Sequence, residues 1–293
     1  MDDQAGAFSA SSRLPGESPA AYLARVADMA TCRRVSFGEG EMVWRIWGTG
    51  RPVVFLHGGY GAWSHWIRNV LPLSQHVRAI VADMPGHGDS DPMAGRPTRE
   101  RMADILARCL DGILPKSGTY DLVGFSMGAN LSAAAIAAYG RSPENLVVIG
   151  PGGLGVSAEK IRGLRKWCPD MPRDELDARH RNNLGVIMLH DAARIDDLAV
   201  HVQRENGLRY RFHVARADAS TLLRDNLGRV DTRLSCIWGE HDVYAIGNRD
   251  RRIAVMRETH PDMRVSVIEG AAHWVMYERP ERFNAELLRL LKG

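Results

Sequence analysis

The chain has 293 residues, a formal net charge of +3 at pH 7 and 45% hydrophobic residues, which is an ordinary composition for a globular protein. Its basic residues are interleaved with acidic ones, which argues against nucleic-acid binding. No apolar run is long enough to span a bilayer, and residues 1–4 lack the basic start of a secretory signal. We therefore expect a cytoplasmic protein that does not bind membranes.

The four cysteines, Cys32, Cys109, Cys168 and Cys236, are scattered and form no C-x-x-C pair. This spacing is typical of reduced thiols in a cytoplasm rather than of disulfides or metal ligands. We expect no metal and no organic cofactor.

The first half of the chain alternates buried apolar runs with helical segments. Residues 1–18 are rich in Ser, Ala, Gly and Pro, and we expect them to be loosely ordered. The predicted strands are 32–37, 42–47, 52–56, 77–82, 120–123 and 146–149, and the predicted helices are 98–114 and 129–139. Such alternation is typical of a mostly parallel sheet covered by helices on both faces.

The alternation stops after residue 154 and resumes with predicted strands at 234–238 and 264–268 and a closing helix at 280–291. The residues between are charged, rich in Arg and helical in period, without a strand-like run. The predicted domains are an N-terminal extension at 1–30, an α/β core at 31–154 and 229–293, and an inserted helical cap at 155–228.

Residues 124–128 spell Gly-Phe-Ser-Met-Gly and lie between the predicted strand 120–123 and the predicted helix 129–139. A G-x-S-x-G turn between strand and helix holds its serine in a strained conformation with the hydroxyl above the sheet. The N-terminus of the following helix favours negative charge beside Ser126. We predict that Ser126 is a nucleophile. The motif also occurs by chance, so this prediction depends on finding a base and a carboxylate to act with the serine.

An activated serine needs a base, and the base needs a carboxylate that orients it. In an open parallel sheet these groups come from loops at the carboxyl ends of strands. Asp242 follows the strand 234–238 and His273 follows the strand 264–268, which gives the chain order Ser, Asp, His. The loop after the strand 146–149 contains no carboxylate, which favours Asp242 as the acid.

The predicted oxyanion hole consists of two backbone N–H groups, those of Met127 and Gly59. Met127 follows the nucleophile, and Gly59 lies in the turn after the strand 52–56. We expect His57 to be a structural residue under this turn, and Asp83 and His87 to organise the next loop rather than to catalyse.

These motifs together resemble the α/β-hydrolase superfamily from about residue 32 to 292. The resemblance implies an eight-stranded, mostly parallel α/β-hydrolase fold with helices on both faces and an inserted helical cap. Within the superfamily the chain is most similar to the meta-cleavage-product hydrolases, which cleave C–C bonds. The similar segments are 63–64, 126–128, 150–155, 273–274, Glu278 and 283–284.

The departures from that family concern the substrate site. Phe125 and His65 stand where the family usually has Asn, which suggests a less acidic and more apolar acyl pocket. A cap Arg of the family binds the substrate carboxylate, and Arg204 is our first candidate for that role. The residues expected to contact substrate are Tyr60, His65, Phe125, Trp274 and Arg204.

The favoured function is a serine hydrolase that cleaves a small carboxylic ester or lactone through an acyl-enzyme. C–C bond hydrolysis of a β-diketone or ring-fission dienoate is the alternative, and a catalytically silent ligand-binding protein on the same fold is the third reading. The expected partner is a small-molecule substrate, and the sequence leaves formation of a homodimer open.

Overall fold

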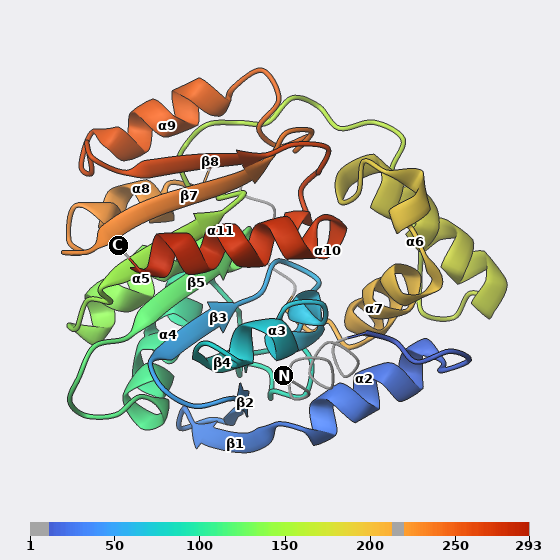
Figure 1. Ribbon diagram of the computed structural model, residues 1–293, viewed down its shortest axis with the longest axis horizontal. Helices are drawn as coiled ribbons and strands as arrows, with labels where there is room; N and C mark the ends of the chain where they lie inside the picture. The colour runs from blue at the N-terminus through green and yellow to red at the C-terminus, as the bar shows by residue number, and fades with distance from the viewer. Residues whose placement is uncertain (1–11, 213–219, 293) are drawn as a thin grey trace, which may run out of the picture.

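The computed structural model describes residues 12–212 and 220–292. Its centre is an eight-stranded sheet with the strand order β1-β2-β4-β3-β5-β6-β7-β8 (Figure 1). The strands are β1 (Thr31–Ser36), β2 (Glu41–Trp47), β3 (Pro52–Leu56), β4 (Arg78–Asp83), β5 (Asp121–Phe125), β6 (Asn145–Ile149), β7 (Arg233–Gly239) and β8 (Arg264–Ile268). Strand β2 is antiparallel to both of its neighbours, and the pairs from β4 to β8 are parallel. The predicted fold class is confirmed.

Helices cover both faces of this sheet, and α11 crosses in front of it in Figure 1. The α-helices are α2 (Pro19–Asp28), α3 (Val70–Ser74), α4 (Arg99–Ile113), α5 (Met127–Tyr139), α6 (Arg173–Ile187), α7 (Asp197–Leu208), α8 (Leu222–Leu227), α9 (Arg249–Arg257), α10 (Val275–Glu278) and α11 (Pro280–Lys292). The described residues also form the short 3-10 helices η1 (Trp63–Trp66) and η2 (Ala192–Arg194). Within the described part of the chain, no helix combines the length and the apolar character needed to cross a lipid bilayer.

The strands divide their apolar side chains between two cores because successive residues point to opposite faces of a sheet. Val54 and Leu122 belong to the core on the face covered by α4, α5, α8 and α9. Val53 and Val123 belong to the core on the opposite face, with side chains of α3, α10 and α11. Burial on both faces explains why β3, β5 and β6 read as continuous apolar runs in the sequence.

Helices α6 and α7 stand beside the sheet, within the segment predicted to be the cap (Figure 1). Helix α8 also falls in that segment but packs against α5 on the sheet, so the predicted limits of the cap remain a prediction. Helix α2, which the sequence analysis did not predict, packs against α7. Ser18 caps its N-terminus, and Tyr22 and Val26 are buried.

Candidate active site

Ser126 occupies the turn between β5 and α5 with φ 51° and ψ −104°. Among the described residues only Ser126 and Tyr60 combine a positive φ with a side chain. Such a backbone costs roughly 1–3 kcal/mol and persists only where surrounding structure imposes it. Here the Ser126 N–H donates to the carbonyl oxygen of Ile149 at 2.8 Å, and the Gly128 N–H donates to that of His57 at 3.0 Å. Two neighbouring strand ends therefore hold the turn.

The two glycines of the pentapeptide are required by close packing. A Cβ at Gly124 would lie 2.8 Å from the Cα of Ala129, and one at Gly128 would lie 2.6 Å from the carbonyl oxygen of Leu56. Backbone atoms cannot move aside as a flexible side chain can, so both positions exclude larger residues. The turn can then approach β3 closely, with Ser126 at its tip.

The His273 imidazole and the Asp242 carboxylate are joined by a hydrogen bond of 2.8 Å between Nδ1 and Oδ2. Both side chains are nearly excluded from solvent. The other carboxylate oxygen, Oδ1, accepts the Tyr244 N–H at 3.0 Å. With its proton on Nδ1 and directed at Asp242, the imidazole keeps Nε2 available to accept a proton.

The loops that carry the two residues are bonded to each other directly. The His241 N–H donates to the carbonyl oxygen of Ala271 at 2.8 Å. A Cβ at Gly239, the last residue of β7, would lie 2.0 Å from the carbonyl oxygen of Ala272. Only glycine allows this approach, which places Asp242 beside His273 across the carboxyl ends of β7 and β8.

The Ser126 turn lies next to this pair. The ring centroids of Phe125 and His273 are 4.9 Å apart. A Cβ at Gly150, the residue after Ile149, would lie 2.8 Å from His273 Cε1 and 2.9 Å from Asp242 Oδ2. Among the described residues, Asp242 is the hydrogen-bond partner of the His273 ring, and the Ser126 hydroxyl does not cap α5. The hydrogen bond between a catalytic serine and its histidine is often long or poorly aligned before substrate binds.

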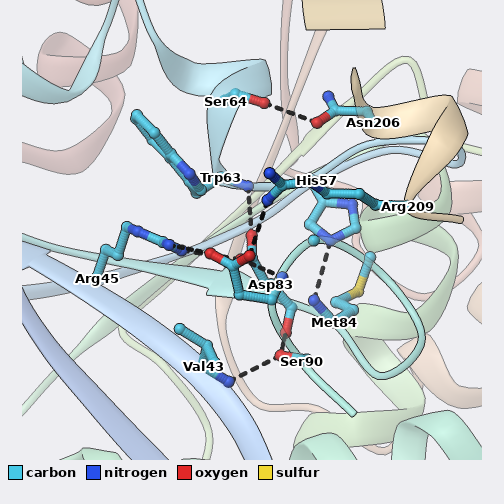
Figure 2. Close-up of polar contacts among 12 residues, drawn as sticks. Val43, Arg45, His57, Trp63, Ser64, Asp83, Met84, Ser90, Asn206 and Arg209 are labelled. Atoms are coloured by element: carbon cyan, nitrogen blue, oxygen red, sulfur yellow. Dashed lines mark hydrogen bonds and ion pairs between the residues drawn. The ribbon is translucent and has the colours of Figure 1, made fainter. Parts of the chain in front are cut away.

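His57 supports the segment that contains Gly59, and Figure 2 shows its bond to Met84. Its Nε2 accepts the Met84 N–H at 3.0 Å, so its proton is on Nδ1, which donates to the carbonyl oxygen of Gly58 at 2.7 Å. Complete burial lowers the pKa of His57 to about 3, so the ring is neutral near pH 7. These contacts fit the structural role that we expected for His57.

Asp83 holds the other end of the same segment (Figure 2). Its carboxylate accepts the Trp63 N–H at 2.7 Å and pairs with the Arg45 guanidinium at 2.8 Å. It also accepts the Asp89 N–H at 3.1 Å. Burial raises the pKa of Asp83, and the nearby Arg45 cation opposes that shift. The carboxylate therefore organises this loop, as expected, rather than facing a reactant.

The N–H groups of Gly59 and Met127 donate to no backbone acceptor within the described residues. A Cβ at Gly58 would lie 3.3 Å from the Ser126 Cβ, which places this segment against the nucleophile turn. At Gly59 the Cβ position is open, with no atom within 4 Å. Both donors are therefore available to a developing oxyanion.

The residues predicted to contact substrate divide into a buried group and one exposed tyrosine. His65, Phe125 and Trp274 are buried, and the His65 ring lies 5.6 Å from that of Phe125 and 5.1 Å from that of Trp274. Burial lowers the pKa of His65 to about 3. Tyr60 is 47% exposed and stacks on Tyr210 with ring centroids 4.0 Å apart.

The alpha/beta hydrolase family profile matches residues 53–286. The chain belongs to the alpha/beta hydrolase family. A curated relative from Comamonas testosteroni, named 2-hydroxy-6-oxononadienedioate/2-hydroxy-6-oxononatrienedioate hydrolase, is 25% identical over 83% of this chain and 88% of its own. A protein of the same name from Burkholderia vietnamiensis is 28% identical over 84% of this chain and 88% of its own.

Solved structures of other hydrolases share the fold of this alpha/beta hydrolase. A meta-cleavage product hydrolase from Pseudomonas fluorescens IP01 superposes with a TM-score of 0.73 at 18% identity, covering 90% of this chain and 98% of that one. A carboxylesterase from Bacillus subtilis gives a TM-score of 0.69 at 20% identity, covering 89% of this chain and 91% of that one. The chain is thus a hydrolase of the serine type, and its substrate has to be argued from its own residues.

Arg204 of this hydrolase does not have the surroundings that we expected of a substrate-binding cation. Its side chain is buried between α6 and α7, where it forms ion pairs with Asp177 and Glu205. It also lies 2.9 Å from Nδ1 of His201. The guanidinium is therefore paired with acids between α6 and α7, and its binding of a substrate carboxylate stays a prediction.

Three features of the site are absent from the predictions made from the sequence. Gly150 and Gly239 allow the catalytic loops to meet, and their signal is a glycine at the carboxyl end of a strand. Ser64 donates to the side-chain oxygen of Asn206 at 2.9 Å, which joins η1 to α7 (Figure 2). No sequence pattern indicates this last contact, because 142 residues separate the two side chains.

Proposed function

We propose that this alpha/beta hydrolase cleaves a small carboxylic ester or lactone through a covalent acyl-enzyme formed on Ser126. The observation that carries the proposal is the strained Ser126 turn beside a His273 imidazole whose Nδ1 is bonded to Asp242. A strained nucleophile, an orienting carboxylate and a base after the carboxyl ends of β5, β7 and β8 match the triad of acyl-transfer enzymes.

In the proposed reaction, the Ser126 hydroxyl attacks the substrate carbonyl carbon and its proton passes to Nε2 of His273. Asp242 keeps the imidazole in the required tautomer and stabilises the cation that forms. The N–H groups of Gly59 and Met127 bind the oxyanion, and each such donor is worth ~3–4 kcal/mol in comparable enzymes. His273 then protonates the leaving oxygen, and a water molecule activated by the same imidazole hydrolyses the acyl-enzyme.

The character of the side chains around Ser126 favours a neutral acyl group. Phe125 and Trp274 are apolar, and burial keeps His65 uncharged near neutral pH. Arg204, the arginine predicted to bind a substrate carboxylate, is paired with two acids. None of these described side chains offers an unpaired cation to offset the hydration that an anionic substrate would lose.

C–C bond hydrolysis is the second candidate, because the curated relatives named above carry the name of dienedioate hydrolases across more than four fifths of both chains. The same Ser126, His273 and Asp242 would act on a β-diketone or a ring-fission dienoate. That reaction differs from ester hydrolysis in its leaving group. The bond to the carbonyl carbon that breaks is a C–C bond, so the leaving group must be protonated on a carbon atom rather than on an oxygen atom. It also calls for a binding site for the acid group of the dienoate.

The test compares two substrate classes on the purified protein, with Ser126→Ala as the control. We expect wild type to hydrolyse short nitrophenyl esters or a lactone, Ser126→Ala to be inactive, and a serine-directed phosphonate to label Ser126. Equal ester rates for the two proteins would overturn the proposal. Bleaching of a dienoate chromophore at a kcat/KM above that of any ester would establish the second candidate instead. An unlabelled Ser126 would indicate the silent ligand-binding protein.

We further propose that the cap is residues 155–228 and that the enzyme works in the cytoplasm, and a homodimer stays open. The four cysteines are all free, which is compatible with a reducing compartment. Size-exclusion chromatography with light scattering at micromolar concentration distinguishes a monomer from a homodimer.

A further inference from the structure

Glu278 is a fully buried carboxylate to which the proposed mechanism assigns no role. It is the last residue of the short helix α10, which begins directly after Trp274. Oε2 accepts the Ala272 N–H at 2.7 Å, and Oε1 accepts the N–H groups of His190 and Asp191 at 2.8 Å and 2.6 Å. A buried charge is tolerated when several donors replace its water, and backbone N–H groups supply them here.

The first of these bonds acts directly on the base. Ala272 is the residue before His273, so Glu278 fixes the peptide that leads into the imidazole. Trp274, the residue after His273, is also fixed on both its backbone and its ring. Its N–H donates to the carbonyl oxygen of Met188 at 2.9 Å, and its indole Nε1 donates to that of His65 at 2.9 Å. His273 is therefore held from both sides along the chain.

The other two bonds join the Glu278 carboxylate to the segment Met188–Asp191, which connects α6 to η2. In Figure 1 the helix α10 lies between α11 and the pair α6 and α7. The same segment reaches the acid loop, because the His190 ring stacks on the His241 ring with centroids 3.6 Å apart and planes 18° apart. His241 immediately precedes Asp242. One short segment thus contacts the loops of both the base and the acid.

We propose that Glu278 is a positioning residue for His273, and that its carboxylate couples the base to the segment Met188–Asp191. This inference rests on the proposed function only in that His273 is the catalytic base. Glu278 touches neither the reacting atoms nor the substrate; it acts through the Ala272 peptide. A displacement of the imidazole by about 1 Å from its working position is enough to cost ~100-fold in rate.

Glu278→Gln tests the role of the carboxylate with a nearly unchanged side-chain shape. The amide oxygen can still accept hydrogen bonds from the N–H groups of His190 and Asp191, and the amide NH2 then faces the Ala272 N–H. Two donors repel each other, so the bond to the base loop is the one that is lost. We expect kcat for ester hydrolysis to fall about 10- to 100-fold with KM changed less than about 3-fold.

Asp121→Asn is the matched control. Asp121 is also a fully buried carboxylate, bonded to Arg51 and Asn145, and it begins β5 at the end opposite to Ser126. We expect this variant to lose thermal stability while its kcat and KM stay close to wild type. If Glu278→Gln keeps the wild-type kcat, or changes kcat no more than Asp121→Asn does, the positioning role is overturned.

Amide hydrogen exchange tests the inference without a substrate. In wild type the amides of Ala272, His190 and Asp191 should exchange slowly, and in Glu278→Gln the Ala272 amide should exchange faster while the core strands do not change. Rapid exchange of Ala272 in wild type would overturn the inference even if the variant did not fold. A wild type that hydrolyses no ester and no dienoate would refute the proposed function, and exchange would still decide the role of Glu278.

Discussion

The Nδ1 atom of His273 lies 2.8 Å from Oδ2 of Asp242, and both side chains are almost fully buried. Burial matters because it removes the water that would otherwise compete for the carboxylate and let the imidazole rotate. The two residues come from loops 31 positions apart, and direct backbone bonding between those loops makes their relative position rigid. The pair is therefore organised before any substrate arrives.

Asp242→Asn tests the orienting role of the carboxylate. An amide can present its NH2 group to Nδ1, which forces the imidazole proton onto Nε2 and leaves no lone pair to receive the Ser126 proton. The same change in a serine protease costs ~10⁴-fold in kcat. We expect a loss of kcat/KM of that order for nitrophenyl butyrate, measured near pH 7. A loss below about 10-fold would show that Asp242 does not orient the base.

Gly150→Ala tests the contact between the strand end of β6 and the catalytic pair. A Cβ at this position, where φ is 50°, would lie 2.8 Å from His273 Cε1 and 2.9 Å from Asp242 Oδ2. The methyl group must displace one of the two side chains, so we expect kcat/KM to fall by about 100-fold. Steady-state kinetics on a short ester measures this.

Gly140→Ala is the control for that prediction. Gly140 ends α5 with φ 74°, and a Cβ there would meet no atom within 4 Å. Alanine should cost about 1–2 kcal/mol of folding free energy from the positive φ alone and leave kcat/KM unchanged. Similar kinetics in the two variants would mean that the crowding of His273 and Asp242 has no consequence for catalysis.

Acidification should destabilise the protein because several histidines are buried as neutral rings. Burial lowers the pKa of His65 from its ordinary value of 6.5 to about 3. The unfolded chain therefore binds a proton below pH 6.5 that the folded chain does not bind until about pH 3. The free energy of unfolding should fall by about 1.4 kcal/mol per pH unit for each such ring across that window.

Urea unfolding at pH 7, 6 and 5 measures this slope. His65→Phe removes one of these titrating rings, so its unfolding free energy should depend less steeply on pH than that of wild type, by about 1.4 kcal/mol per unit well below pH 6.5. Identical slopes in the two proteins would show that His65 is protonated in the folded state.

The positions of Ser126, Asp242 and His273 could be predicted because carboxyl ends of parallel strands meet at one edge of the sheet. This prediction uses only the chain order of the three residues and the strand pattern, and it requires no knowledge of side-chain packing. The surroundings of Arg204 could not be predicted in this way, since its partner Asp177 lies on α6, and the position of α6 depends on how it packs against α7. The solvent exposure of the Tyr60 side chain and its stacking on Tyr210 also depend on tertiary contacts.

Helix α2 is a different case, because its signals were present in the sequence. Ser18 followed by Pro19 is a favourable pair for the cap and first turn of a helix. The Ser, Ala, Gly and Pro content of the preceding residues obscured this start. Local composition is a weaker guide than a capping residue placed directly before an amphipathic stretch.

Arg204→Ala should reduce stability rather than substrate binding. The substitution removes a buried guanidinium and its bonds to the partly exposed Asp177 and Glu205, so we expect a loss of about 1–3 kcal/mol in the free energy of unfolding. Arg173→Ala removes an exposed arginine that lies 3.5 Å from the same Asp177, and it should cost less than about 0.5 kcal/mol. Denaturant unfolding distinguishes the two.

The KM for a neutral ester and for a dienoate acid should be unchanged in both variants, because the Arg204 guanidinium is occupied within the cap. An increase of 10-fold or more in the KM for the dienoate acid, seen in Arg204→Ala but not in Arg173→Ala, would mean that Arg204 leaves its acidic partners to bind a carboxylate, and would favour C–C bond hydrolysis over ester hydrolysis.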